Sequence, residues 1–86
     1  MSFRIEQDTS ARDSFGEYRY RIYSGARLVA HYWHDYRGDE HGIEFLNGTS
    51  ESYPVGSMVE FIEGGGPKPL VLSARAIAYL EMKVAS

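Results

Sequence analysis

The feature that most constrains this fold is a strict alternation over residues 17–23, which read Glu-Tyr-Arg-Tyr-Arg-Ile-Tyr and are followed by Ser-Gly-Ala. Successive side chains of a strand point to opposite faces, which places Tyr18, Tyr20 and Ile22 on one face and the arginines on the other. The small residues at 24–26 predict a tight turn, because glycine adopts a positive φ without steric cost. The chain is therefore expected to build an antiparallel sheet around a hairpin at this point.

The return strand of this hairpin, residues 28–34, has two possible facings. A two-residue turn would bring one set of side chains to the face of the tyrosines, namely Val29, His31 and Trp33. A three-residue turn would bring the alternate set, namely Leu28, Ala30 and Tyr32. A slip of one residue reverses every side chain, so the turn length decides which set is buried. We favour the two-residue turn, which buries the only tryptophan.

Further short strands and loops are expected along the chain from alternation, apolar runs and turn residues. The strands are expected at residues 3–6, 43–46, 49–52 and 58–62, the last with Val59 and Phe61 on one face. Loops are expected at residues 8–16, 34–42 and 64–69. Asn47-Gly48 is a strong hairpin turn signal, and residues 49–52 after it are either a weak edge strand or, as their polarity also allows, a loop.

A helix is predicted at the carboxy-terminal end, from Ala74 to about Ala85, with Ser73 as its cap. Its apolar stripe is expected to contain Ile77, Leu80 and Val84, widened by Ala76, Ala78 and Met82. We predict a single domain over residues 1–86, because so short a chain cannot build two cores. The fold class is α+β, an antiparallel sheet of four to six strands with one C-terminal helix packed on a face.

Composition narrows the class of protein further. Cysteine is absent, which excludes disulfides and thiolate metal sites and favours an intracellular location. The amino terminus lacks the apolar core of a signal peptide, and no apolar run approaches the roughly 20 residues that span a bilayer. We therefore expect a cytoplasmic protein with no membrane segment.

The distribution of charge bears on nucleic-acid binding. The net charge is −3, and residues 35–63 carry one arginine against seven acidic residues. A segment of this charge repels phosphate, so nucleic acid is not an expected partner. The alternative is weak single-strand binding on the Arg19/Arg21 face, with Tyr23 and either Tyr32 or Trp33 as stacking partners.

The polar segment after the return strand is the best candidate for a binding site. It combines an arginine that can grip a carboxylate or phosphate with acidic and imidazole side chains, and loops on rigid hairpins often hold function. The predicted binding residues are Trp33, His34, Asp35, Arg37, Asp39 and His41. The competing interpretation is an ordered structural loop, in which Asp35 caps the turn and Arg37 pairs with a neighbouring acid.

Metal binding and catalysis are the alternatives for the same segment. Zinc could be bound by the three histidines, His31, His34 and His41, with help from Asp35, Asp39 or Glu40. The spacing of these residues matches no zinc signature, so we predict no cofactor. An acid–base enzyme would use His34, Asp35, Asp39 and His41. The chain has no cysteine nucleophile and no serine in a nucleophile-elbow context. We interpret the protein as a non-enzymatic binding or interaction module.

Aromatic content bears on oligomeric state. Aromatic residues make up 14% of the chain, and seven of them are tyrosines. One helix of about three turns does not cover a whole sheet, so aromatic side chains left exposed could pack against a second copy. We therefore predict a homodimer, with a further protein as a possible partner.

Overall fold

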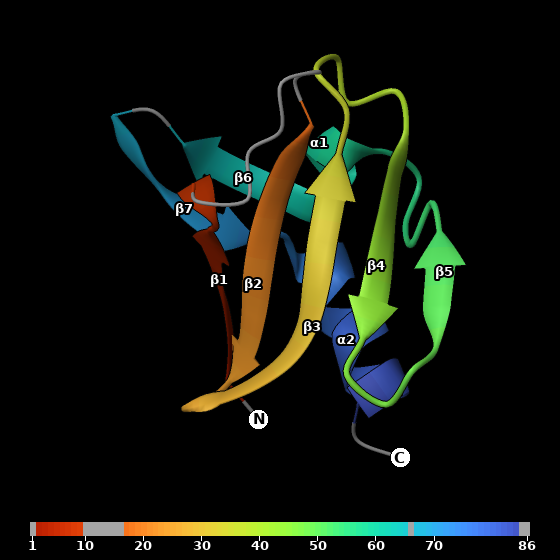
Figure 1. Cartoon of the computed structure of the whole chain (residues 1–86). Helices are drawn as coiled ribbons and strands as arrows, with labels where there is room; N and C mark the ends of the chain where they lie inside the picture. The colour runs from red at the N-terminus through yellow and green to blue at the C-terminus, as the bar shows by residue number, and fades with distance from the viewer. Residues whose placement is uncertain (1, 10–16, 66, 85–86) are drawn as a thin grey trace.

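The computed structural model describes residues 2–9, 17–65 and 67–84, and it has the expected α+β class (Figure 1). One antiparallel sheet of five strands runs in the order β1-β2-β3-β4-β5. The strands are β1 (Phe3–Gln7), β2 (Tyr18–Ser24), β3 (Arg27–His34), β4 (His41–Phe45) and β5 (Ser50–Ser52). Residues 10–16 of the loop expected at 8–16 lie outside the described residues.

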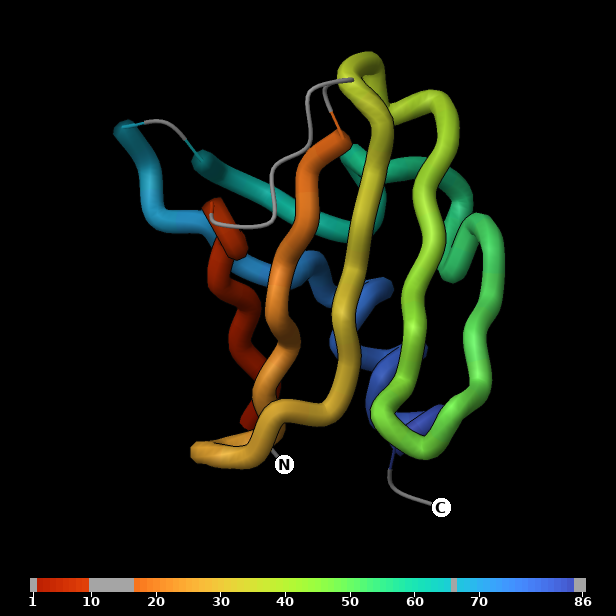
Figure 2. The backbone as a smooth tube through the Cα atoms, in the orientation of Figure 1, coloured from red at the N-terminus to blue at the C-terminus, as the bar shows by residue number. Residues whose placement is uncertain are grey.

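The remaining elements lie on one face of this sheet, which we call the inner face (Figures 1 and 2). They are α1 (Met58–Phe61), β6 (Ile62–Gly65), β7 (Lys68–Leu72) and α2 (Ala74–Val84). β6 and β7 pair with each other as a separate two-stranded sheet. No described helix or strand covers the opposite, outer face, as is common for antiparallel sheets.

The hydrophobic core lies between the inner face and this second layer. Tyr32 and Phe61 are completely buried, and their rings stack with centroids 4.1 Å apart. The sheet contributes Ile5, Tyr20, Ile22, Ala30, Tyr32, Ile43 and Phe45, and the second layer contributes Phe61, Leu72, Ala76, Tyr79 and Leu80. Five of the twelve aromatic residues, namely Tyr20, Tyr32, Phe45, Phe61 and Tyr79, are buried in this core.

A β-bulge determines the facing of β3. The turn has the expected two residues, since Ser24 pairs with Arg27. The register then shifts, because Tyr23 pairs with Leu28 but Ile22 pairs with Ala30, so that Val29 has no partner of its own. The favoured facing is consequently wrong. Alternate residues of β3 from Ala30 onward, namely Ala30, Tyr32 and His34, share the inner face with Tyr18, Tyr20 and Ile22.

The expected strand at residues 58–62 is also wrong. Met58–Phe61 form one helical turn, and a strand begins only at Ile62. Val59 is 71% exposed whereas Phe61 is fully buried, so the two side chains do not share a face. The stacking of Phe61 on Tyr32 outweighs the β propensity of this short segment.

Residues 64–65 and 67–69 of the loop expected at 64–69 form the end of a hairpin, and residue 66 lies outside the described residues. Gly65 pairs with Lys68 across β6 and β7, and the register is irregular between Glu63 and Gly65. Gly64 and Gly65 have φ values of +85° and +98°, which other residues rarely adopt. The glycines therefore shape a bulged ladder.

The C-terminal helix begins where it was expected. The Ser73 hydroxyl accepts a hydrogen bond from the Ala76 amide at 3.0 Å, the geometry of an N-cap, and donates one to the carbonyl of Glu60. The buried side chains of α2 are Ala76, Tyr79 and Leu80, with Ile77 and Val84 partly buried. Met82 is 68% exposed and Ala78 is exposed, so the predicted stripe was too wide on that side.

Candidate functional site

Two histidines face each other inside the sheet. His34 at the end of β3 pairs across the strands with His41 at the start of β4, and Tyr18 of β2 lies on the other side of His34. His34 is 5% exposed and His41 is 1% exposed. Because the bulge turns this end of β3 inward, both imidazoles belong to the core layer rather than to the loop.

Each of these histidines is paired with a tyrosine. The Nδ1 atom of His34 lies 2.7 Å from the carbonyl oxygen of Asp35, which only accepts, so Nδ1 carries the hydrogen. In the neutral tautomer Nε2 then accepts from the hydroxyl of Tyr20 at 2.7 Å. The hydroxyl of Tyr32 lies 2.9 Å from Nδ1 of His41. Burial raises the pKa of both tyrosines, which keeps their hydroxyls protonated.

His41 is held in the neutral form. Burial lowers the pKa of the imidazole, and electrostatic interaction with the nearby His34 lowers it further. The backbone of Gly56 raises this pKa, but by less than the two other effects lower it. The Nε2 atom of His41 has no hydrogen-bond partner among the described residues. The imidazole of His41 is only 1% exposed, so it offers almost no surface to a substrate in this arrangement.

The loop between β3 and β4, residues 35–40, is closed by its own backbone. The amide of Asp35 donates to Glu40 and the amide of Gly38 donates to the carbonyl of Asp35, at 2.9 and 3.1 Å. The Asp35 carboxylate accepts from the amide of Asp39 at 2.9 Å. Partial burial would raise the pKa of Asp35, but hydrogen bonding of its carboxylate to the backbone of Glu40, Gly38, Asp39 and Arg37 outweighs this effect and lowers the pKa. Asp35 therefore caps the turn, as the interpretation of residues 34–42 as an ordered structural loop predicted.

The predicted binding residues do not converge on one point. Trp33 is half-buried and lies on the outer face, opposite in direction to His34 on the same strand. Arg37 and Asp39 are exposed in the loop, while His41 is enclosed in the core. An acid–base site needs its side chains to converge on one point. In this arrangement the proposed set does not converge, namely His34, Asp35, Asp39 and His41.

His34 nevertheless lines a cleft of about 660 Å³ between the sheet and the β6–β7 hairpin. Its ring stacks on Tyr18 with centroids 5.1 Å apart, and the Tyr20 ring stacks on it at 5.3 Å. Tyr36 from the 35–40 loop also lines the cleft and is 74% exposed. The remaining lining residues are Ile5, Glu6, Gln7, Met58, Ile62, Gly64, Gly65, Lys68 and Leu70.

Sequence reasoning missed most of this aromatic cleft. Tyr18 and Tyr20 were placed correctly on one face, and that alternation was the available signal for one wall. The opposite wall comes from β6 and β7, where the sequence predicted a strand that ends at residue 62 and a loop at residues 64–69. Tyr36 lay inside the candidate loop, but its exposure could be known only from the folded chain.

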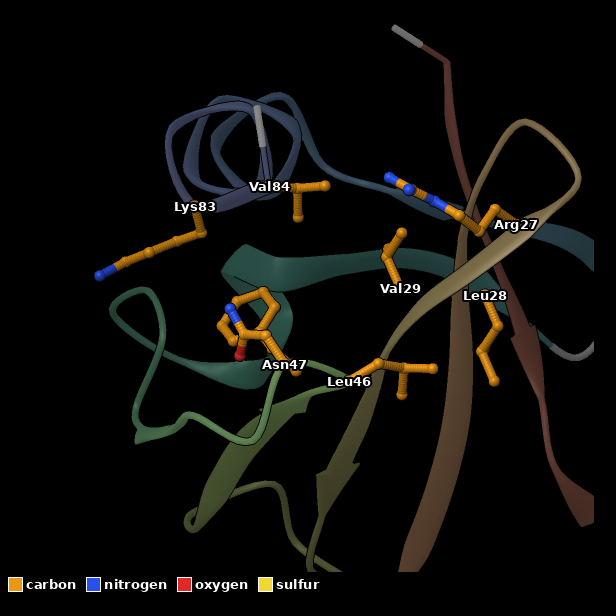
Figure 3. A pocket seen from close by; sticks show the side chains of 8 residues that line it. Arg27, Leu28, Val29, Leu46, Asn47, Lys83 and Val84 are labelled. Atoms are coloured by element: carbon orange, nitrogen blue, oxygen red, sulfur yellow. The ribbon is translucent and has the colours of Figure 1, made fainter. Parts of the chain in front are cut away.

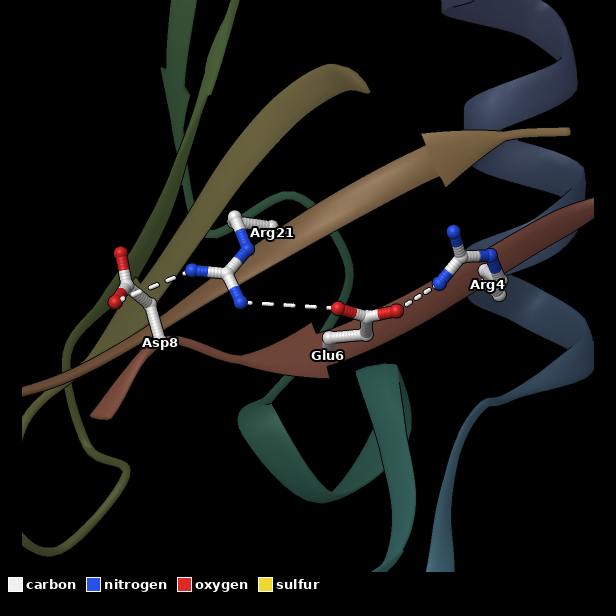
Figure 4. A network of polar contacts seen from close by, with 4 residues as sticks. All are labelled: Arg4, Glu6, Asp8 and Arg21. Atoms are coloured by element: carbon white, nitrogen blue, oxygen red, sulfur yellow. Dashed lines mark hydrogen bonds and ion pairs between the residues drawn. The ribbon is translucent and has the colours of Figure 1, made fainter. Parts of the chain in front are cut away.

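The arginines of the outer face are paired with acids of the same sheet (Figure 4). Arg21 lies 3.7 Å from Glu6 and 3.2 Å from Asp8, and Arg4 pairs with Glu6. Arg19 pairs with Glu17 at 2.8 Å. Tyr32, one proposed stacking residue, is fully buried on the inner face. The Arg19/Arg21 face is thus a mixed-charge surface, which gives phosphates little net attraction.

The described residues contain no group of three or more histidine or acidic side chains arranged to hold a metal ion. Within the same residues, no helix is long and apolar enough to cross a bilayer. No protein-family model, no curated protein and no solved structure matches this chain. Any functional assignment therefore has to come from the geometry itself.

Proposed function

We propose that this protein is a non-enzymatic binding module and that the aromatic cleft beside the 35–40 loop is its binding site. The observation that carries the proposal is Tyr36, a large ring that is 74% exposed and borders a cleft floored by the stacked rings of Tyr18 and His34. An exposed aromatic side chain beside a preformed cleft is typical of binding surfaces.

The chemistry of the cleft favours binding over catalysis. Both ring nitrogens of His34 are hydrogen-bonded, to Tyr20 and to the backbone at Asp35, so the imidazole is a fixed wall rather than a free base. Of the two charged residues that line the cleft, Glu6 is already paired with Arg4 and Arg21, so Lys68 is the one that could contact a partner. Such a surface suits the aromatic side chain of a partner protein, with weak orientation by Lys68.

The test uses p-cresol and indole, which mimic the side chains of tyrosine and tryptophan, as probes in NMR titrations of labelled protein. We expect saturable shifts at Tyr18, His34 and Tyr36, and we expect Tyr36→Ala to weaken them. Met82→Ala is the matched control, because Met82 is 68% exposed and lies away from the cleft on α2. Equal loss in both variants, or shifts spread over the whole surface, would contradict the proposal.

We also propose that the chain forms a homodimer through the uncovered outer face of the sheet. One cross-strand row on this face runs Arg21, His31 and Glu44. A twofold axis near His31 would place Arg21 of one copy opposite Glu44 of the other, as an isologous interface requires. The half-buried Trp33 lies in the next row and would gain further burial there.

Light scattering tests the dimer directly. We expect a mass of twice 9.7 kDa at tens of micromolar protein, and a lower mass for Glu44→Lys, which places like charges opposite each other. Glu63→Lys is the control, since Glu63 is an exposed acid on β6 and lies away from this face. A mass of 9.7 kDa for the unmodified chain would refute the dimer. The cysteine-free composition supports a cytoplasmic location for this module.

A further inference from the structure

We propose a second ligand site, separate from the aromatic cleft, that takes an apolar carboxylate such as a medium-chain fatty acid. The site is a cavity of about 540 Å³ at the other end of the sheet, between the β2–β3 turn, the β4–β5 turn and the last turn of α2 (Figure 3). Its volume lies in the ordinary range for small-molecule sites.

The walls of the cavity are mainly apolar. The bulge residue Val29 and Phe45 are 7% and 8% exposed, and they form its inner surface. Leu28 and Val84 are partly buried, whereas Leu46 is 57% exposed. The amide of Leu46 donates to the carbonyl of Val29 at 3.1 Å, which fixes the two apolar residues beside each other. A hydrocarbon chain in the cavity would remove the exposed side chain of Leu46 from water.

Every polar side chain that lines the cavity has N–H groups that donate hydrogen bonds. These side chains are Arg27, Asn47 and Lys83, and no acidic side chain lines the cavity. This is unusual in a chain of net charge −3. The Oδ1 atom of Asn47 already accepts from the amide and hydroxyl of Thr49, at 2.9 and 2.7 Å, which leaves its NH₂ group to donate to a ligand.

Arg27 is the cation that would bind the carboxylate. It is exposed, it has no ion pair among the described residues, and its guanidinium extends across the cavity toward Val84 (Figure 3). Lys83 instead points away and is held by Glu51 at 2.6 Å. The carboxylate is placed at Arg27 rather than over the end of α2, because the last carbonyls of a helix repel anions.

Together these contacts define a ligand with one anionic end and one apolar end. A guanidinium binds a carboxylate in a bidentate manner. The apolar walls favour binding of an alkyl chain and disfavour a second charge. The cavity offers no acidic side chain that could pair with an ammonium group, and the Oδ1 atom of Asn47 already accepts two hydrogen bonds from Thr49. We therefore expect selection for the carboxylate over an alcohol or amine with the same alkyl chain.

The test is a titration of labelled protein with octanoate, octan-1-ol and octylamine, followed by NMR. We expect octanoate to shift the signals of Arg27, Val29, Asn47 and Val84 with a dissociation constant on the order of 1 mM or tighter. Octanol should bind about tenfold more weakly, and octylamine more weakly still, because both lack the charge that pairs with Arg27.

Two variants make the test decisive. Arg27→Gln should weaken octanoate about tenfold and leave octanol unchanged, whereas Leu46→Ser should weaken both ligands. Arg75→Gln is the control, since Arg75 is an exposed arginine on α2 that pairs with Glu60 outside the cavity. Octanol binding as tightly as octanoate, or an equal effect of Arg27→Gln and Arg75→Gln, would overturn the proposal. Tyr36→Ala should leave octanoate binding intact, which separates this site from the aromatic cleft.

Discussion

Replacement of Gly42 by alanine tests the packing of the outer face. A Cβ atom at this position would lie 2.7 Å from Nε1, 2.9 Å from Cε2 and 3.0 Å from Cζ2 of Trp33. These are neighbouring atoms of the indole, so the ring lies across the backbone of Gly42 on the next strand. Unstrained carbon contacts are about 3.5–4.0 Å, so the ring has to move by roughly 0.5–1 Å.

The expected magnitude follows from two opposing effects. Overpacking costs about 1–3 kcal/mol, and alanine in place of glycine in a strand returns about 0.5–1 kcal/mol. We therefore expect Gly42→Ala to lower the free energy of unfolding by about 1–2 kcal/mol, since the half-buried ring of Trp33 can relax only in part. In a Trp33→Ala background the obstacle is gone, and the same change should raise stability by about 0.5–1 kcal/mol.

The assay is a double-mutant cycle measured by urea denaturation. The two effects differ by about 1.5–3 kcal/mol, which is the coupling free energy expected between Trp33 and Gly42. Trp33→Ala alone should cost about 1–3 kcal/mol, less than a fully buried tryptophan would. A coupling below about 0.5 kcal/mol would show that the indole does not rest on Gly42, and the description of the outer face would fail with it.

The remaining predictions concern the core and the cap of α2. Tyr32→Phe keeps the stack on Phe61 but leaves Nδ1 of His41 unpaired, so it should destabilise by about 1–3 kcal/mol, whereas Tyr36→Phe at the exposed loop should change stability by less than about 0.5 kcal/mol. Ser73→Ala removes the N-cap of α2 and should cost about 1–2 kcal/mol by urea denaturation, against less than about 0.5 kcal/mol for Ser50→Ala on the edge strand. The folded-state pKa of His41 lies below its unfolded value of 6.5. Its contribution to the free energy of unfolding is therefore complete above pH 6.5 and is lost as the pH falls through the folded-state pKa. The urea midpoint should therefore decline as the pH falls below about 6.5, and His41→Gln should flatten that decline, with His31→Gln as the control.

Local sequence patterns were sufficient for the elements whose side chains follow a simple period. The alternation at residues 17–23 predicted β2, and Asn47-Gly48 predicted the turn before the edge strand β5. Ser73 predicted the start of α2 because the cap depends only on the residues that follow it. In each of these cases the physical cause lies within a few residues of its effect.

Where the prediction failed, the cause lay elsewhere in the chain. Met58–Phe61 form a helical turn because Phe61 packs on Tyr32, a residue of β3 that is distant in sequence. The aromatic cleft could not be predicted for the same reason, since its walls come from β1, β2 and the β6–β7 hairpin. Only His34 of the predicted binding residues lines it, because strand facing is decided by register rather than by residue type.

The bulge at Val29 links the fold to both proposed ligand sites. Without the extra residue, the regular register would turn Trp33 and His31 inward and would expose Tyr32 and His34. With it, His34 reaches the aromatic cleft at one end of β3, and Val29 itself is buried against the apolar cavity at the other end. The one inserted residue thus decides which side chains of β3 line the aromatic cleft, which line the apolar cavity and which lie on the outer face with Trp33. A function that depends on these surfaces depends on that register more than on any single side chain of the loop.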